Sequence, residues 1–209
     1  ISDLIREYFP SCETVGCFAR VTDVASKTDE ELAVLREAGY TGLTIGIETG
    51  DDAALAFMNK GYAAQDIVAQ CARLDAAGIA YAFFYLAGIS GKGHGIEGAR
   101  LTAAVCNQTR PSLIGANMLT IYKNSELYQE VIAGNWEEET EIEKYQEIKA
   151  LVDGLEIPVE FAMLGASNPV MMQGRLPEQR VQIIAALDRV IDEIGEDRLR
   201  HYRTNLKHL

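Results

Sequence analysis

Polar residues that directly follow apolar runs are the best candidates for chemistry in this sequence, and Glu48 is the clearest of them. It ends the apolar run 42–48 and is followed at once by the turn residues Thr49 and Gly50. A carboxylate in that position is placed to accept hydrogen bonds from vicinal hydroxyl groups, such as those of a ribose. The same carboxylate could instead cap a helix that begins near Asp51, or pair with Arg20. The position alone does not decide between these roles.

Arg20 lies near the end of the apolar run 15–21 and is a candidate for binding an anion. Its guanidinium group can hold a carboxylate through two parallel hydrogen bonds. The competing interpretation is an internal pairing with Glu48 or Asp23. Because one arginine can serve both purposes, the two interpretations are compatible.

A glycine-rich segment, 88–95, follows the apolar run 80–86 and holds four glycines in eight residues. Glycines let backbone amides approach a ligand closely, and a helix N-terminus after the segment would favour an anion. The spacing matches neither the P-loop nor the G-x-G-x-x-G pattern, so phosphate binding is not indicated. His94 lies inside this segment, but a single histidine in a solvated loop is usually incidental. The sequence has no catalytic triad pattern and three histidines in all, so it does not predict a protein metal site.

Five apolar runs rich in β-branched and aromatic residues are the predicted strands. They cover residues 15–21, 42–48, 80–86, 113–122 and 159–164. Segments with helical periodicity, bounded by N-cap residues and by Gly or Pro stop signals, alternate with these runs. The predicted helices cover residues 2–8, 28–38, 64–77, 96–109, 125–133, 141–155 and 177–194.

Strands that alternate with helices form parallel sheets with right-handed crossovers. Consecutive apolar positions in several of these strands indicate a sheet that is covered on both faces. The active sites of such sheets lie at the carboxyl ends of the strands, so we expect the polar residues described above to meet at one edge. Five strands are too few for a closed eight-stranded barrel. Periodicity alone leaves both a doubly wound sheet and a partial barrel open.

The composition is that of an ordinary globular domain with an acidic surface. The chain has 209 residues, with 19 Lys and Arg against 31 Asp and Glu, which gives a net charge of −12. This charge disfavours nucleic acid as a partner. The most apolar run, 79–89, is far shorter than the roughly 20 residues that span a bilayer, so we expect a cytoplasmic protein without a membrane partner. The scattered cysteines are expected to be buried filler. The basic cluster 198–203 is expected to be a solvated helix face that complements the acidic body, rather than a nucleic-acid patch.

Several loops, taken together, resemble those of radical S-adenosylmethionine (SAM) enzymes. Residues 43–55 and 58–61 are similar to the "GIESG-D--L--MNKG" segment that follows the fourth barrel strand in many members of this superfamily. Residues 85–93 and 120–127 resemble the loops after the fifth and sixth strands. Residues 167–168 and 174–178 are similar to the ending of a bacterial subgroup described as Fe–S oxidoreductases. The resemblance covers residues from about 15 to 194.

This resemblance implies an α/β fold, a partial parallel (β/α) barrel of the radical SAM type whose N-terminal strands are missing. The barrel part would cover residues 1–194, and a C-terminal helical extension would cover residues 195–209. The C-x-x-x-C-x-x-C loop that holds a [4Fe–4S] cluster would lie upstream. Because the chain opens at Ile1 inside a predicted helix, we expect it to be a fragment that is inactive by itself.

The resemblance also implies a function for the intact protein. With a [4Fe–4S] cluster and an external electron donor, it would cleave S-adenosylmethionine reductively and generate a 5′-deoxyadenosyl radical that acts on an unknown substrate. Glu48 would contact the ribose and Arg20 the methionine carboxylate. The implied cofactor-binding residues are Arg20, Glu48, Gly50, Tyr85, Gly88, Gly91 and Tyr122. The alternatives are a cluster-free barrel lyase and a non-catalytic module that binds SAM or a nucleotide.

Overall fold

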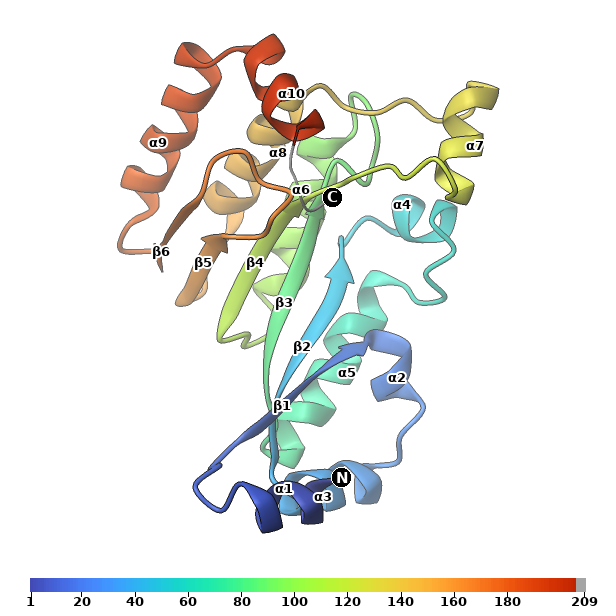
Figure 1. Ribbon diagram of the computed structural model, residues 1–209, viewed down its shortest axis with the longest axis vertical. Coiled ribbons are helices and arrows are strands. Elements are labelled where there is room, and N and C mark those ends of the chain that lie inside the picture. The colour runs from blue at the N-terminus through green and yellow to red at the C-terminus, as the bar shows by residue number, and fades with distance from the viewer. Residues whose placement is uncertain (206–209) are drawn as a thin grey trace.

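The computed structural model describes residues 1–205, and its centre is one six-stranded sheet (Figure 1). The strands follow the chain order β1-β2-β3-β4-β5-β6 across the sheet. The first five are parallel, and β6 is antiparallel to β5. The strands are β1 (Val15–Arg20), β2 (Tyr40–Glu48), β3 (Ala80–Ala87), β4 (Leu113–Met118), β5 (Val159–Met163) and β6 (Met172–Leu176). The parallel α/β architecture predicted from the sequence is therefore confirmed.

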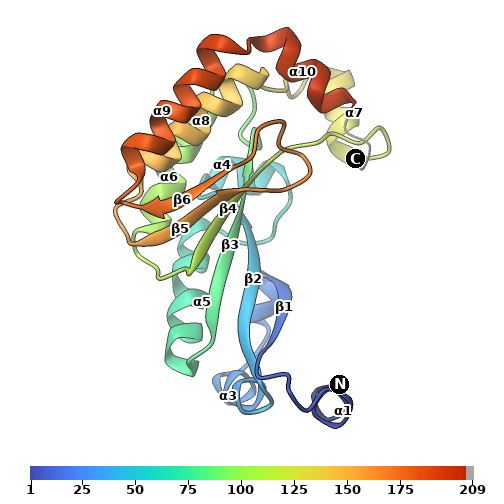
Figure 2. The same ribbon diagram turned by 60° about the vertical axis from the view of Figure 1, so that its left-hand side comes forward.

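Helices α5, α6 and α8 cover one face of this sheet, and α9 lies beside α8 (Figures 1 and 2). Among residues 1–205, the opposite face of β1–β4 carries no covering layer, which differs from the expectation of a sheet covered on both faces. The helices are α1 (Ser2–Tyr8), α2 (Val21–Ala25), α3 (Asp29–Glu37), α4 (Asp52–Phe57), α5 (Ala64–Ala77), α6 (Gly95–Cys106), α7 (Glu126–Ala133), α8 (Glu141–Gly154), α9 (Arg180–Glu193) and α10 (Glu196–Thr204).

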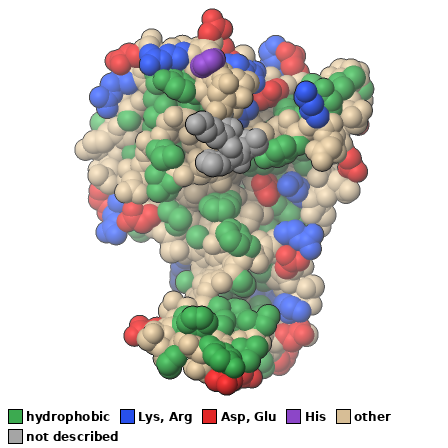
Figure 3. Space-filling view, viewed as in Figure 1, with side chains coloured by type: hydrophobic (Ala, Val, Ile, Leu, Met, Phe, Trp, Pro, Cys, Tyr) green, Lys and Arg blue, Asp and Glu red, His purple; other side chains and the backbone are tan. Residues whose placement is uncertain are grey.

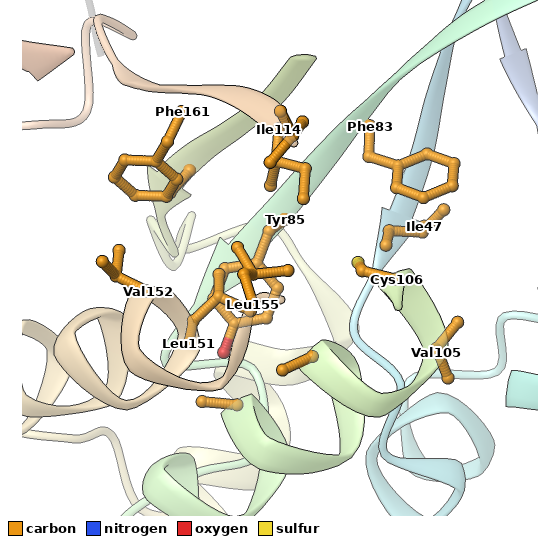
Figure 4. Close-up of a cluster of buried hydrophobic side chains, with 14 of the residues drawn as sticks. Ile47, Phe83, Tyr85, Val105, Cys106, Ile114, Leu151, Val152, Leu155 and Phe161 are labelled. Carbon is orange, nitrogen blue, oxygen red and sulfur yellow. The ribbon is translucent and has the colours of Figure 1, made fainter. Parts of the chain in front are cut away.

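The side chains of β3 show this asymmetry directly. Tyr81, Phe83 and Tyr85 are buried against the helices, whereas Phe84 and Leu86 point to the open face and are half-buried. The cluster between the sheet and α6 and α8 is drawn in Figure 4. Complete burial of each large apolar side chain in this cluster contributes about 1.5–3 kcal/mol to folding. Packing on the helical face thus stabilises the sheet, and the open face remains available for contact with a ligand.

The structure differs from the predicted elements in a few places. β4 ends at Met118 rather than near 122. The Leu119 amide still donates to the Ala87 carbonyl (2.9 Å), but β3 ends at Ala87 and therefore offers no further partner. β6 was not predicted, because its sequence mixes polar, glycine and apolar residues. The short helix α2 was not predicted either, whereas α4 begins where the sequence indicated, after Asp51. Helix α3 begins after the predicted capping box of Thr28 and Glu31.

Helix α10 occupies the predicted C-terminal extension, whose last four residues, 206–209, lie outside the described part of the chain. Leu199 of α10 is completely buried in the same core as the sheet. The basic cluster complements acidic residues, as expected, since Arg200 and Arg203 both pair with Glu138 and Glu141. The expectation of a solvated face was wrong for Arg203, whose side chain is buried. No helix in the described range 1–205 combines the length and the apolar character that crossing a membrane requires.

Candidate functional site

The carboxyl ends of β1, β2, β3 and β4 border a cavity of about 350 Å³ on the open face of the sheet. Figure 3 shows this face in space-filling form, with apolar side chains exposed in its middle. Phe18 is the most exposed of the apolar side chains that line the cavity, at 77%. The lining residues are Phe18, Ala19, Arg20, Asp23, Thr44, Gly46, Glu48, Phe84, Tyr85, Leu86 and Asn117.

Glu48 lies at an irregularity of the sheet. Its φ of 62° is in the left-handed region, and the pairing of β2 with β3 shifts register between Gly46 and Glu48. A non-glycine residue in this conformation costs on the order of 1–3 kcal/mol and persists where its surroundings hold it. The Tyr62 hydroxyl provides such support, because it lies 3.2 Å from the Gly46 carbonyl and 3.0 Å from the Ile47 carbonyl and donates to them.

The conformation of Glu48 turns its carboxylate back over Gly46. A Cβ atom at Gly46 would lie 2.9 Å from Oε1 of Glu48, so the glycine leaves the room that the carboxylate occupies. Lys60 Nζ lies 3.6 Å from the same oxygen, and both side chains are about one quarter exposed. Within residues 1–205 the carboxylate accepts no hydrogen bond. It is therefore free to accept hydrogen bonds from a ligand.

The structure decides between the roles that the sequence left open for Glu48. Helix α4 is capped by Asp51, whose Oδ1 accepts from the amides of Ala53 (2.9 Å) and Ala54 (3.3 Å). Arg20 pairs with Asp23 rather than with Glu48. Burial, followed by the charge of Glu48, raises the pKa of Tyr62, which keeps this hydroxyl protonated and able to donate.

Arg20 lines the cavity, but its guanidinium group is already engaged. Nη2 lies 2.8 Å from Oδ1 of Asp23, and Nε lies 3.2 Å from Oδ2. The hydrogen bonds from Arg20 lower the pKa of Asp23. A ligand carboxylate at this position would have to share the arginine with Asp23.

Three of the predicted cofactor residues lie against the helices instead of the open face. The Gly50 amide donates to Oγ1 of Thr102 (2.7 Å), and α6 fills the space beside this glycine. The Tyr85 side chain is buried, with its hydroxyl donating to Glu147, while its backbone borders the cavity. The Gly88 amide donates to Oε2 of Glu147 (2.7 Å). These contacts give the three residues packing roles, and their cofactor contacts remain predictions.

The other two predicted residues lie apart from the cavity. Gly91 borders a second cavity, of about 380 Å³, beside α4, where a Cβ atom on the glycine would lie 2.8 Å from Nε1 of Trp136. Tyr122 is 51% exposed and lines neither cavity. Of the predicted set, the structure thus brings Arg20 and the Glu48 carboxylate together on the open face.

Asn117 is a site residue that the sequence analysis missed. It lies on β4, and its carboxamide lines the cavity without a hydrogen-bond partner among residues 1–205. The signal that could have identified it is a single amide side chain within an apolar strand. This side chain lies two residues after Gly115 and therefore on the same face of the strand. Tyr62 and Lys60 were also missed, because they reach Glu48 from the segment between α4 and α5.

The loop between β3 and α6 is fixed from below by two buried carboxyl groups. Glu147 accepts from the amide of Gly88 and the hydroxyl of Tyr85, and Glu139 accepts from the amide of Gly95 (3.0 Å). Burial raises the pKa of both groups, and the neighbouring Glu139 raises that of Glu147 further. The protonated form of Glu147 is therefore favoured at the base of the loop.

Cluster chemistry does not fit the described residues. Residues 1–205 hold no group of three or more His, Cys, Asp and Glu side chains placed to bind a metal ion. Cys71 and Cys106 are buried filler, as expected, but Cys12 and Cys17 are exposed, so the expectation was wrong for these two. In the part of the chain that the structure describes, no cysteine set can hold an Fe–S cluster.

No protein family model and no curated protein matches this chain. Among solved structures it is similar to Elp3 of the archaeon Methanocaldococcus infernus with an N-terminal deletion, with a TM-score of 0.64 and 14% sequence identity. This likeness shows the fold. The match covers 85% of this chain and 42% of the Elp3 chain, so the chain spans less than half of that protein.

Two further similar structures are of TsrM, a radical S-adenosylmethionine methyltransferase from Kitasatospora setae, one with cobalamin and a [4Fe–4S] cluster and one with tryptophan and a SAM analogue. Their TM-scores are 0.44 and 0.42, both at 16% identity. They cover 56% and 55% of this chain and 23% of TsrM. Structural similarity at this level gives no information about the site.

Proposed function

We propose that this chain is part of the barrel of a radical SAM enzyme, in which Glu48 binds the ribose of S-adenosylmethionine. The observation that carries the proposal is the carboxylate of Glu48, a residue whose backbone is left-handed at the end of β2. This carboxylate accepts no hydrogen bond among the described residues. The likeness of the fold to Elp3, a member of the radical SAM superfamily, supports it. The resemblance of residues 43–61 to the superfamily motif supports it independently.

The open face fits the adenosyl part of SAM in two respects. Glu48 offers two carboxylate oxygens to the vicinal hydroxyls, and Gly46 keeps that carboxylate folded along the sheet. Arg20, shared with Asp23, would face the methionine carboxylate from β1. Bound SAM, together with a [4Fe–4S] cluster, would supply one-electron chemistry at this edge of the sheet. The cluster, its cysteine ligands and the electron donor belong, in this proposal, to the remainder of the protein and its partners.

The cluster-free lyase has no comparable support. Such a reaction needs a lysine or metal-binding carboxylates at a strand end. Lys92 lies in the loop after β3 and pairs with Glu137. Lys144 is completely buried and paired with Glu138 and Glu141. Neither amine lines the cavity on the open face.

The test is the affinity of the whole protein for SAM, measured by calorimetry after anaerobic reconstitution with iron and sulfide. Glu48→Gln should weaken binding about 10- to 100-fold, because hydrogen bonds to a charged group contribute about 1.5–3 kcal/mol. The matched control is Glu97→Gln, on the surface of α6, whose carboxylate pairs with Arg100. Equal affinities for Glu48→Gln and the control would contradict the proposal, as would reconstituted protein that never forms 5′-deoxyadenosine from SAM.

A further inference from the structure

A groove between helices α4 and α7 lies outside the proposed cofactor site. We infer that this groove binds a segment of a partner protein, in which an apolar residue is flanked by Lys or Arg. The residues that define this α4–α7 groove are Asp51, Phe57, Glu126, Leu127, Glu130 and Trp136. None of them lines the cavity beside Glu48, so the inference does not depend on what that cavity binds.

Two cavities join to form the α4–α7 groove. The second cavity, of about 380 Å³, lies between α4 and the segment that follows α7, and a further cavity of about 320 Å³ lies between α4 and α7 itself. Phe57 lines both cavities. On the other wall, the carboxamide of Asn135 in the second cavity donates to Oε2 of Glu130 in the further one (2.8 Å). The groove is therefore continuous, and each half has the size of a ligand pocket, about 300–1,000 Å³.

Apolar side chains on both walls of the groove remain exposed. Phe57 of α4 is 45% exposed. Met58, which follows α4, and Leu127 of α7 line the cavity beside it. Helix α7 has no buried residue, and Figure 1 shows it standing away from the sheet on the two segments that join it to β4 and α8. Exposed aromatic and methionine side chains that line a groove are typical of surfaces that bind apolar residues of a partner.

The carboxylates along the groove lack cationic partners. Asp51, Glu126 and Glu130 line it and form no ion pair among residues 1–205. The hydrogen bonds that Asp51 and Glu130 accept come from neutral groups, among them the Ser90 hydroxyl (3.0 Å). Unpaired carboxylates beside an apolar wall attract a Lys or Arg side chain, because its stem packs on the wall while its charge reaches the acid.

The basic side chains of the groove do not cancel this charge. Lys92 pairs with Glu137, and both residues line the second cavity. His94 is the other basic residue there, so carboxylates remain in excess over the whole groove. The indole ring of Trp136 adds an aromatic face beside the second cavity, and such a face favours a cation.

The described part of the chain offers no free segment of this character. Its basic cluster lies in α10, where Arg200 and Arg203 are bound to Glu138 and Glu141. A second copy of the chain would present the same engaged arginines and the same net charge of −12. The charge disfavours a nucleic acid strand as well. The occupant that fits is therefore a segment of a different protein, which is basic and partly apolar.

The experiment measures the binding of a fluorescein-labelled peptide, Lys-Arg-Leu-Phe-Lys-Arg with blocked ends, to the whole protein by fluorescence anisotropy. Phe57→Ala should weaken binding about 5- to 30-fold, as for a central residue of an interface. Leu127→Ala, on the opposite wall, should weaken it as well. Glu130→Gln should weaken it about 1.5- to 5-fold and reduce its salt dependence. The matched controls are Phe9→Ala, at an exposed phenylalanine after α1, and Glu97→Gln on α6, and both should leave the affinity unchanged.

Four results would overturn the inference. One is a peptide affinity that neither Phe57→Ala nor Leu127→Ala changes, and absence of binding counts as this result. Because the two variants alter opposite walls, the second decides the matter if the first does not fold. Another is equal affinity for a peptide in which Ser replaces Leu and Phe, which would show attraction by charge alone. Displacement of the peptide by SAM would assign the groove to the cofactor. A dimer that dissociates in Phe57→Ala, measured by analytical ultracentrifugation, would assign it to a second copy of the chain.

Discussion

The geometry of Glu48 depends on a glycine two residues before it and on two residues of the segment between α4 and α5. Gly46 leaves room for the carboxylate, Tyr62 holds the strand carbonyls before it, and Lys60 lies beside it. The contacts of Gly46 and Lys60 concern the position of the carboxylate, whereas Tyr62 holds the strand itself. Substitution of Gly46 should therefore separate binding from stability, and substitution of Tyr62 should change stability.

Gly46→Ala should weaken SAM binding while leaving the fold intact. The new Cβ atom would lie 2.9 Å from Oε1 of Glu48 and displace the carboxylate. We expect an affinity loss within about threefold of that caused by Glu48→Gln, and a small change in the free energy of unfolding. Gly42→Ala is the matched control on the same strand, because its Cβ atom would find its nearest neighbour at 3.9 Å. An effect of equal size in both variants would show that the displaced carboxylate is not the cause.

Tyr62→Phe should lower stability, because it removes the hydroxyl that donates to the carbonyls of Gly46 and Ile47. The expected loss in the free energy of unfolding is about 0.5–1.5 kcal/mol, measured by denaturant titration. Tyr122→Phe, at an exposed tyrosine, should change it by less than about 0.5 kcal/mol. A stable Tyr62→Phe variant that still binds SAM normally would remove Tyr62 from the support of Glu48.

At the scale of residues, the sequence predicted which side chain to examine but not how it is held. An acid at the end of an apolar run is a local pattern, so Glu48 could be identified without a structure. Its conformation depends on Tyr62 and on a register shift between two strands, and neither is visible in a local pattern. Asn117 was missed for a related reason. Its importance depends on which face of β4 borders the cavity, and a local sequence pattern does not show this.

At the scale of elements, the loop between β3 and α6 is held by a pair of buried acids on the helix side. Glu147 and Glu139 accept the amides at the two ends of the loop, from Gly88 and Gly95. This loop, whose Gly88 and Gly91 are predicted to bind the cofactor, is thus tied to α8 by Glu147 and to the segment before α8 by Glu139. This connection makes the order of the loop depend on the protonation of the pair.

The acid pair should make the protein less stable as the pH rises. The pKa of Glu147 is raised in the folded state, mainly by burial, so the folded state keeps a proton that the unfolded state loses above about pH 4.3. The stabilising contribution is complete below that value and is lost as the pH rises through the folded pKa. Glu147→Gln, which carries no titrating proton, should show a smaller fall in stability between about pH 5 and pH 8.

The measurement is the free energy of unfolding from urea titrations across this pH range. Glu97→Gln serves as the control, because its exposed carboxylate on α6 should leave the pH dependence of the wild type unchanged. The same slope in Glu147→Gln and the wild type would show that Glu147 does not keep a proton in the folded state.

The elements themselves were largely predictable, with the exception of the sheet edge. The parallel strands β1–β5 are apolar runs separated by helices, and that pattern follows from burial. β6 is held by pairing with β5 and by an ion pair between Arg175 and Glu160 (2.8 Å). The residues of β6 show no strand pattern of their own. The strand forms because its backbone pairs with β5, and the local sequence does not show that pairing.

At the scale of the whole molecule, α10 is bound to the strand ends by a buried arginine. Arg203 donates to Glu141 (2.8 Å), to Glu138 (3.0 Å) and to the carbonyl of Leu119 (2.8 Å), which follows β4. The sequence predicted a basic cluster that complements acidic residues. It could not predict that the partners are the acids just before and at the start of α8, because they lie about sixty residues earlier in the chain.

Arg203→Met should therefore destabilise the whole protein and not α10 alone. Removal of one partner from a buried ionic network leaves the other charges uncompensated and costs about 3–5 kcal/mol. The charges of Glu138 and Glu141 would remain, with Arg200 and Lys144 as their nearest cations. Arg198→Met is the matched control, since Arg198 contacts only Tyr202 of its own helix among the described side chains. If both variants unfold at the same urea concentration, α10 is attached through Leu199 and its apolar contacts, and the arginine network contributes nothing measurable.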